Sequence, residues 1–219
     1  GKSPNIVLPD ADFAAVLPPT VQGVLVNTGQ SCIAPTRILV QKERQAEAVG
    51  VIKAMFDGTA VGDPMSEGGH IGPVVNKAQF DKIQGLIQSA IDEGATLETG
   101  GTGLPSNVNR GYYIKPTVFS GVTRDMRIAN EEIFGAVAAI QKFTSEEEVI
   151  TLANDTDYGL GSYLYTSDNA RIWRISDALE FGMVGINEPS FATEVAPFGG
   201  VKHSGFGREG SHLGIEEFC

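Results

Sequence analysis

Short apolar runs alternate along this chain with longer segments of helical periodicity, and this alternation constrains the fold more than any other feature. Strands that are separated by helical segments of about ten or more residues pair in parallel within one sheet. The runs expected to form strands cover residues 6–8, 37–40, 136–143, 163–165 and 183–186, and those expected to form helices include 43–56, 76–93 and 168–179. The sequence therefore predicts an α/β fold with an open, mostly parallel sheet flanked by helices.

Two consecutive prolines interrupt the first helical segment of the chain. Asp10 or Asp12 can cap a helix that begins here. Proline in a helix interior costs about 3 kcal/mol, because it removes a backbone donor and clashes with the preceding turn. We therefore expect the helix to break at Pro18 and Pro19, with a second helix over residues 20–28.

Polar capping residues and glycine-rich stretches mark where other elements begin and end. Asn76 and Ser145 each stand three residues before a Gln or Glu, which is the pattern of a helix N-cap. Residues 57–75 and 100–110 are rich in glycine and predict irregular connections, and the second stretch lacks the lysine of a phosphate-binding loop. Residues 112–119 predict a strand that a proline interrupts.

Charge and cysteine content argue against several classes of protein. The chain has 16 basic and 27 acidic residues, and a net charge of −11 disfavours a surface for nucleic acid or for an anionic membrane. No apolar run approaches the roughly 20 residues that cross a bilayer, and no segment has the pattern of a secretory leader. Two cysteines among 219 residues do not make a disulfide framework. We therefore expect a globular protein of a reducing compartment, the cytoplasm.

One cysteine stands in a setting that suits a nucleophile. Residues 27–32, Asn-Thr-Gly-Gln-Ser-Cys, end an apolar run with small and polar residues, so nothing bulky in the sequence shields the sulfur of Cys32. Gly29 allows the backbone to turn, and cysteine is both a nucleophile and a good leaving group. The alternative is a buried structural cysteine, because free cysteine mostly behaves as a small apolar residue. The hexapeptide by itself leaves both interpretations open.

Several separated segments match the motifs of one enzyme family. They are Gly1-Lys2-Ser3-Pro4 before a strand, Asn27-x-Gly29-Gln30-x-Cys32, Glu131-Glu132-Ile133-Phe134-Gly135, Asn154-Asp155-x-x-Tyr158-Gly159-Leu160, Pro197-Phe198-Gly199-Gly200 and Ser204-Gly205-x-Gly207-Arg208-Glu209. A single motif would be weak evidence, but these occur in order over nearly the whole chain. In this respect the chain resembles the aldehyde dehydrogenase superfamily.

The resemblance implies a defined part of such an enzyme. Residues 1–219 are similar to the catalytic domain, without the N-terminal dinucleotide-binding half or the C-terminal oligomerisation strand. The family oxidises a small-molecule aldehyde to a carboxylic acid with NAD or NADP, through a cysteine thiohemiacetal and a thioester, and the full-length enzyme is expected to be a homo-oligomer. The family's general base is the glutamate of a Glu-Leu-Gly-Gly-Lys motif, of which Gly1-Lys2 matches the end. We therefore expect the isolated chain to have little dehydrogenase activity.

The resemblance also assigns roles to positions of this chain. Cys32 matches the nucleophile, whose own amide would help to stabilise the oxyanion. Glu132 and Phe134 match positions that hold the nicotinamide ribose and pack beside the ring. Gln79 and Lys82 fall on positions that approach the cofactor in relatives. From the residues alone, a capped turn and a core phenylalanine are the preferred explanations of Glu132 and Phe134. A solvated helix face explains Gln79 and Lys82 nearly as well.

The substrate pocket is implied in the same way. Phe198 matches an aromatic wall of the substrate tunnel, and we expect Phe191 to lie near it. The C-terminal region is most similar to succinate-semialdehyde dehydrogenases, which hold the substrate carboxylate with an arginine and a serine. Val26 and Ala192 stand at those two positions here, and a carboxylate without partners is costly to bury. A neutral or aromatic aldehyde is therefore at least as suitable a substrate as succinate semialdehyde.

Two other functions remain open at this point. One is a CoA-acylating aldehyde dehydrogenase, in which CoA rather than water takes the acyl group, and the other is a non-catalytic module with an idle thiol. His70, His203 and His212 lack the spacing of metal ligands, so no metal is implied.

Overall fold

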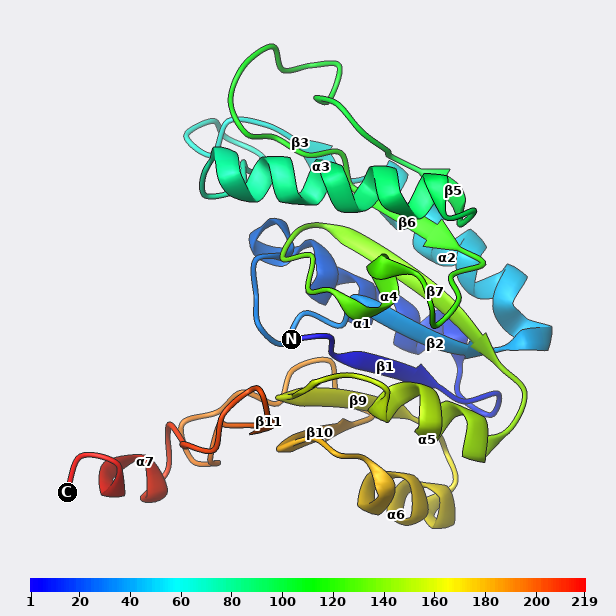
Figure 1. Ribbon diagram of the computed structural model, residues 1–219, viewed down its shortest axis with the longest axis vertical. Coiled ribbons are helices and arrows are strands. Elements are labelled where there is room, and N and C mark those ends of the chain that lie inside the picture. The colour runs from blue at the N-terminus through cyan, green and yellow to red at the C-terminus, as the bar shows by residue number, and fades with distance from the viewer.

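A seven-stranded sheet runs through the centre of the computed structural model, which describes residues 1–219 (Figure 1). All neighbouring strands are parallel except the antiparallel pair at one edge. The predicted α/β fold with an open, mostly parallel sheet is therefore confirmed. In spatial order the strands are β10 (Met183–Ile186), β9 (Gly161–Tyr165), β1 (Pro4–Val7), β2 (Arg37–Gln41), β7 (Val137–Phe143), β6 (Thr117–Ser120) and β5 (Thr96–Thr99).

Helices cover both faces of this sheet because its strands are apolar on both sides. In β1, Val7 points into the larger core cluster with the apolar residues of α1 (Phe13–Leu25) and α2 (Gln45–Asp57). Ile6 points the other way, into a smaller cluster with α5 (Glu146–Asn154) and α6 (Asn169–Ala178). α3 (Lys77–Asp92) and the short α4 (Arg127–Asn130) pack together at the β5 end of the sheet, far from α6 (Figure 1).

The remaining elements are short. β3 (Ala60–Val61) pairs in parallel with β4 (His70–Ile71) inside the glycine-rich connection, and β8 (Tyr158–Gly159) pairs antiparallel with β11 (Val201–Lys202). Lys42–Arg44 forms a 3₁₀ turn before α2. The C-terminal segment ends in α7 (Leu213–Glu216) and extends away from the sheet (Figure 1).

The predicted break at Pro18 and Pro19 is wrong, because α1 continues through both prolines. Leu17, Val21 and Val24 are fully buried on one side of the helix, and this burial outweighs the loss of two backbone donors. The carbonyls left without donors belong to the exposed turn at residues 14–15, where water can reach them.

The strand predicted over residues 112–119 is shorter than expected, and β5 and α4 were not anticipated. The strand begins only at Thr117, whose amide donates to the carbonyl of Ala136 at 3.0 Å, because Pro116 has no amide to continue the ladder. β5 is an edge strand whose apolar residue, Leu97, is exposed. Such a strand lacks the apolar run that identifies a buried one.

Four polar side chains cap four of the five longer helices, and only α2 has no side-chain cap. Asp12 accepts from the amides of Ala14 and Ala15 at the start of α1. Asn76, Ser145 and Asp168 cap α3, α5 and α6 in the same way. The capping positions expected at residues 12, 76 and 145 are confirmed.

Candidate active site

The chain makes a left-handed turn immediately before Cys32. Helix α1 is followed by a short 3₁₀ segment, Val26–Gly29. Within it Asn27, Thr28 and Gly29 have φ angles of 53°, 57° and 75°. Left-handed backbone is unfavourable for residues with a Cβ atom, so two consecutive non-glycine residues keep this shape only where the surroundings enforce it.

Side chains of the motif itself enforce the turn. Nδ2 of Asn27 donates to the carbonyl of Gln30 at 3.0 Å, and Nε2 of Gln30 donates back to the carbonyl of Asn27 at 3.1 Å. Oε1 of Gln30 accepts from the amide of Val75 at 2.8 Å, and the Thr28 hydroxyl donates to the carbonyl of Gly72 at 2.9 Å. The Asn-x-Gly-Gln pattern therefore fixes the turn and ties it to the glycine-rich connection that precedes α3.

The 27–33 loop, which carries the nucleophile candidate, meets the 131–135 loop backbone to backbone. A Cβ atom at Gly29 would lie 2.2 Å from the carbonyl carbon and oxygen of Gly135. Gly135 in turn packs on α3, where a Cβ atom would lie 2.6 Å from Cδ1 of Ile83. Neither loop has room for a side chain at this contact.

Cys32 is exposed, and Glu132 lies close to it. A Cβ atom at Gly1 would be 3.6 Å from the carbonyl oxygen of Cys32, and the backbone nitrogen of Gly1 lies against the half-buried carboxylate of Glu132. The first residue of the chain thus stands between the two. The exposure of Cys32 contradicts the alternative of a buried structural cysteine. The other cysteine, Cys219, is also exposed and lies at the far C-terminal end.

The 131–135 loop is held from behind by residues of two other elements. Phe134, half-buried, has a φ of 59°. Nε2 of Gln79 in α3 donates to the carbonyls of Ile133 and Phe134 at 2.8 and 3.1 Å. Nζ of Lys2 donates to the carbonyl of Ile128 at 2.9 Å, in the helix α4 that leads into the loop. Gln79 therefore fixes the loop, and its direct approach to a cofactor stays a prediction.

Lys82 adds positive charge at the edge of the same loop. It is exposed on α3, one turn beyond Gln79. Hydrogen bonds from Arg127 lower the pKa of the Glu131 carboxyl, and the charge of Lys82 lowers that pKa further. The side chain of Lys82 is free to reach a ligand or to stay in solvent.

Lys2 is a fully buried cation beside a second one. Burial, reinforced by the charge of Arg37, lowers the pKa of the Lys2 ammonium to about 7, while Glu132 partly opposes the shift. Burial also lowers the pKa of Arg37 to about 10. The Arg37 guanidinium donates to the carbonyls of Leu152 and Ala153, both at 2.6 Å, in the last turn of α5. Sequence reasoning gave Lys2 no role, although a lysine directly before a buried strand was a signal that could have indicated one.

A cavity of about 300 Å³ opens beside the nucleophile candidate. Ser31 and Ile33, on either side of Cys32, line it together with Val26 and Tyr163. No charged side chain contributes to its lining. The other lining residues are Pro19, Gln22, Gly23, Ala34, Pro35, Pro189 and Ser190.

Phe191 packs against strands β9 and β10 of the sheet near this cavity. Its ring centroid lies 4.9 Å from that of Tyr163. Cβ atoms at Gly161 and Gly185 would lie 2.7 and 2.6 Å from the Phe191 ring, so the ring rests on β9 and β10 where both strands carry glycine. The neighbouring Ala192 is exposed.

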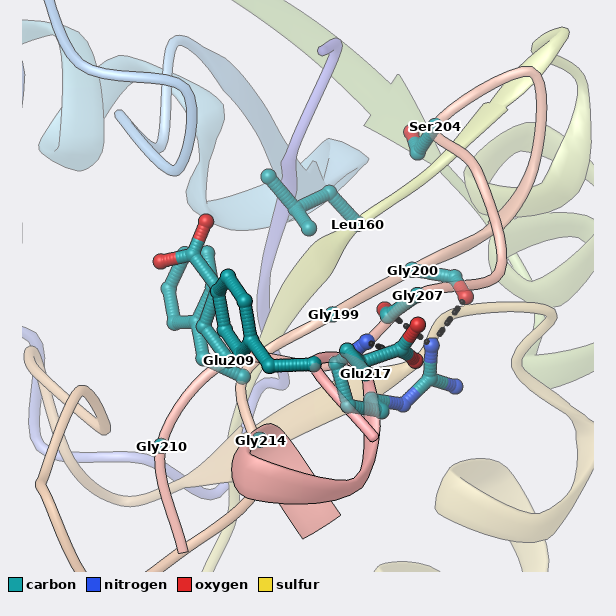
Figure 2. A pocket seen from close by; sticks show the side chains of 12 residues that line it. Leu160, Gly199, Gly200, Ser204, Gly207, Glu209, Gly210, Gly214 and Glu217 are labelled. Atoms are coloured by element: carbon teal, nitrogen blue, oxygen red, sulfur yellow. Dashed lines mark hydrogen bonds between the residues drawn. The ribbon is translucent and has the colours of Figure 1, made fainter.

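Phe198 lines a second cavity, of about 540 Å³, between the C-terminal loops (Figure 2). Two backbone hydrogen bonds of 2.8 and 2.7 Å join Phe198 to Glu209. The Arg208 guanidinium donates to the carbonyls of Gly200, Phe206 and Gly207 and so holds these glycine-rich loops together. Figure 2 draws the bonds to Gly200 and Gly207. Phe191 does not line this cavity, so the two phenylalanines expected near each other occupy different surroundings.

The structure contains neither a cluster of metal ligands nor a membrane-spanning helix. No group of three or more His, Cys, Asp or Glu side chains is placed to hold a metal ion. His70 instead pairs its Nε2 with the carbonyl of Asp63 at 2.6 Å. None of the helices combines the length and apolarity that a membrane span requires.

Comparisons with known proteins agree with this geometry. The model of the aldehyde dehydrogenase family matches residues 1–219. A succinate semialdehyde dehydrogenase of Acinetobacter baylyi is 41% identical over 222 residues, a match that covers 100% of this chain and 44% of that protein. The crystal structure of an aldehyde dehydrogenase from Bartonella henselae is 50% identical with a TM-score of 0.96, and the match covers 100% of this chain and 45% of that one.

A second solved structure carries ligands. It is the C291A mutant of aldehyde dehydrogenase C from Pseudomonas syringae in complex with NAD+ and octanal. That protein is 44% identical, with a TM-score of 0.96 over 100% of this chain and 45% of its own. The chain therefore spans a little under half the length of the relatives it matches.

Proposed function

The chain belongs to the aldehyde dehydrogenase family, and from this premise we propose that it supplies the nucleophile-bearing domain of an enzyme that oxidises an aldehyde to a carboxylic acid with NAD+ or NADP+. The observation that carries the proposal is the exposed Cys32 on a tightly held turn, beside an uncharged cavity and in backbone contact with the loop that carries Glu132. A thiol that must meet a substrate has to be accessible, and its backbone has to be fixed.

Cys32 would add its thiolate to the aldehyde carbonyl and form a thiohemiacetal. The amide of Cys32 donates to no acceptor within the chain, so it is free to donate to the oxyanion that develops on the substrate. Loss of hydride from the thiohemiacetal carbon leaves a thioester on Cys32, and water releases the acid from it. The good leaving-group character of the thiolate favours this last step.

The residues around the 131–135 loop fit a nicotinamide cofactor, which supplies the hydride acceptor when bound. The Glu132 carboxylate is half-buried and has the chemistry to accept hydrogen bonds from ribose hydroxyls. Phe134 is half-buried on the same loop, where an aromatic face can limit the position of a ring. The solved relative in complex with NAD+ supports this assignment. We propose that residues outside these loops decide between NAD+ and NADP+.

The chain spans 44–45% of three matched relatives, and we propose that a dinucleotide-binding half, with the general base and the second oxyanion donor, must join it for turnover. Aldehyde-dependent reduction of NAD+ or NADP+ by the 219-residue chain should therefore be a small fraction of that by the full-length protein. Equal activity of the two would contradict this division of labour.

The uncharged lining of the cavity beside Cys32 supports a neutral aldehyde as substrate. A carboxylate would enter it without a cationic partner, at a cost of about 2 kcal/mol or more. The relative that binds octanal supports the same class. We expect kcat/KM for octanal to exceed that for succinate semialdehyde by at least about tenfold.

A single substitution tests this substrate class directly. Val26→Arg brings a cation to the cavity, and it should raise kcat/KM for succinate semialdehyde relative to octanal. Val195→Arg places the same charge at an exposed site outside the cavity and is the matched control. A wild-type preference for succinate semialdehyde would refute the neutral class while leaving aldehyde oxidation intact.

A further inference from the structure

A tyrosine of the central sheet holds Ile33, the residue that follows Cys32. The hydroxyl of Tyr163 donates to the carbonyl of Ile33 at 2.8 Å. Tyr163 stands in the middle of β9, which is hydrogen-bonded on one side to β1 and on the other to β10. The hydrogen bond therefore connects the 27–33 loop to a rigid part of the sheet rather than to another loop.

The ring of Tyr163 has little freedom to move. Tyr163 is only 1% exposed, and its ring packs against that of Phe191 with centroids 4.9 Å apart. Phe191 itself rests on the glycines of β9 and β10, with no space for a Cβ atom at Gly161 or Gly185. A hydroxyl on so confined a ring loses little entropy when it holds the carbonyl of Ile33.

No other side chain donates to this side of the loop. The hydrogen bonds of Asn27, Thr28 and Gln30 all lie before Cys32 in the chain. Tyr163 is the only side chain that donates a hydrogen bond to the carbonyl of Ile33, directly after Cys32. Without it this side of the loop would be held only by backbone hydrogen bonds, such as that from the amide of Ala34 to the carbonyl of Ser31 at 3.2 Å.

We infer that Tyr163 is a positioning residue for the nucleophile: it acts through the carbonyl of Ile33 to fix the Cys32 backbone, and its ring closes the adjoining cavity. The inference rests on the proposed function for its catalytic consequence, but the hydrogen bond and the cavity wall do not depend on it. A thiol whose backbone is displaced loses its alignment with the carbonyl carbon, which lowers the rate of the chemical step more than the affinity for substrate.

Tyr163→Phe in the full-length protein removes the hydroxyl and keeps the ring. We expect kcat to fall about five- to tenfold, the worth of one neutral hydrogen bond, with KM for the aldehyde within about twofold. The matched control is Tyr165→Phe, two residues along the same strand and equally buried, because the Tyr165 hydroxyl lies toward Thr20 of α1 and not toward the loop.

Hydrogen exchange supplies a readout that does not depend on activity. Amides of residues 31–34 should exchange about threefold faster or more in Tyr163→Phe than in the wild type, and not in Tyr165→Phe. Phe191→Leu, which loosens the ring without removing the hydroxyl, should give a smaller change in the same direction. Unchanged exchange in Tyr163→Phe, or an equal change in both tyrosine variants, would overturn the inference.

The two proposals fail in different ways. The full-length protein could lack aldehyde oxidation and still show faster amide exchange at residues 31–34 in Tyr163→Phe. This result would contradict the proposed function and support the positioning role. An active enzyme in which Tyr163→Phe leaves both kcat and exchange unaltered would keep the function and end the positioning role.

Discussion

The 27–33 and 131–135 loops both have strained backbones, but different kinds of hydrogen bond hold them in place. Each contains left-handed backbone at residues other than glycine, and the two touch through Gly29 and Gly135. The 27–33 loop is fixed largely by its own polar side chains and exposes its cysteine. The 131–135 loop contributes one such side chain, Glu131, which accepts from Arg127 of α4. From behind, the amide of Gln79 in α3 holds two of its carbonyls and the ammonium of Lys2 holds α4.

This difference follows from what each loop presents. A loop that offers a reactive atom to solvent must keep that atom free, so its backbone is fixed by residues that are not the reactive one. A loop that offers a carboxylate and a ring can be held through its carbonyls, because Glu132 and Phe134 stay available. We therefore expect substitutions in the first loop to affect chemistry and those behind the second to affect cofactor affinity.

The largest effect should come from the cysteine of the first loop. Cys32→Ala in the full-length protein should lower aldehyde oxidation by at least about 10⁴-fold, because no other nucleophile can form the thioester. The thiol is exposed, so the melting temperature should hardly change. Cys219→Ala is the control and should leave the activity intact. Substantial activity in Cys32→Ala would remove the nucleophile assignment.

A methyl group at the contact between the loops should be the next most damaging change. Gly29→Ala places a Cβ atom against the Gly135 backbone at a residue with φ of 75°. The strain and the overlap together should lower the free energy of unfolding by about 3 kcal/mol. Gly85→Ala in α3, where a Cβ atom meets nothing within 4 Å, should instead stabilise the protein by up to about 1 kcal/mol. Chemical denaturation of both variants measures the contrast.

The buried ammonium of Lys2 should make the free energy of unfolding depend on pH. Its pKa is lowered from 10.5 to about 7 in the folded chain, so between these values the unfolded chain binds a proton that the folded chain does not. The free energy of unfolding therefore rises with pH across this window, and the penalty for burying the charge is complete below pH 7.

Lys2→Met removes the titrating group while keeping a long side chain. The stability of the wild type relative to Lys2→Met should increase by about 1 kcal/mol per pH unit between pH 7 and 10. Parallel stability curves for the two proteins over this range would show that Lys2 stays charged when buried. The comparison with Lys2→Met cancels the titration of other groups.

The smallest effect should come from Gln79. Gln79→Ala removes two hydrogen bonds to the carbonyls of Ile133 and Phe134, and it should weaken cofactor binding about five- to tenfold. Gln88→Ala on the same helix, whose amide bonds only to the exposed Asp92, is the matched control. Equal dissociation constants for NAD+ in Gln79→Ala and the wild type would show that the loop keeps its shape without this support.

The sequence predicted those parts of the fold that depend on apolar pattern and on capping. Buried parallel strands are continuous apolar runs, so β1, β2, β7 and β9 were visible, and the partly buried edge strand β10 was visible from its own apolar run. The helices that Asn76 and Ser145 cap were visible as well. The edge strand β5 was not visible, because its sequence, Thr-Leu-Glu-Thr, has no such run. The two prolines of α1 led to a wrong prediction of a helix break. The free-energy cost of a proline can be judged from the local sequence, whereas the burial of the helix that offsets this cost depends on the whole sheet.

The candidate site was predictable only in part, for a different reason. Motif resemblance pointed to Cys32 and Glu132, which the fold brings to either side of Gly1. It said nothing of Tyr163, whose role depends on a contact between β9 and a loop that is remote in sequence. It also gave Gln79 a place near the cofactor, whereas the backbone carbonyls that Gln79 holds are visible only in three dimensions.

The contact between Gly29 and Gly135 matters for gene shuffling among relatives. A crossover at any position between these residues takes the two loops from different parents, although their backbones touch without a side chain to absorb a mismatch. Even a displacement of a few tenths of an ångström at such a contact must pass into the backbone of one loop or the other. Recombined genes should therefore inherit both loops from one parent, although more than a hundred positions separate the two loops along the chain.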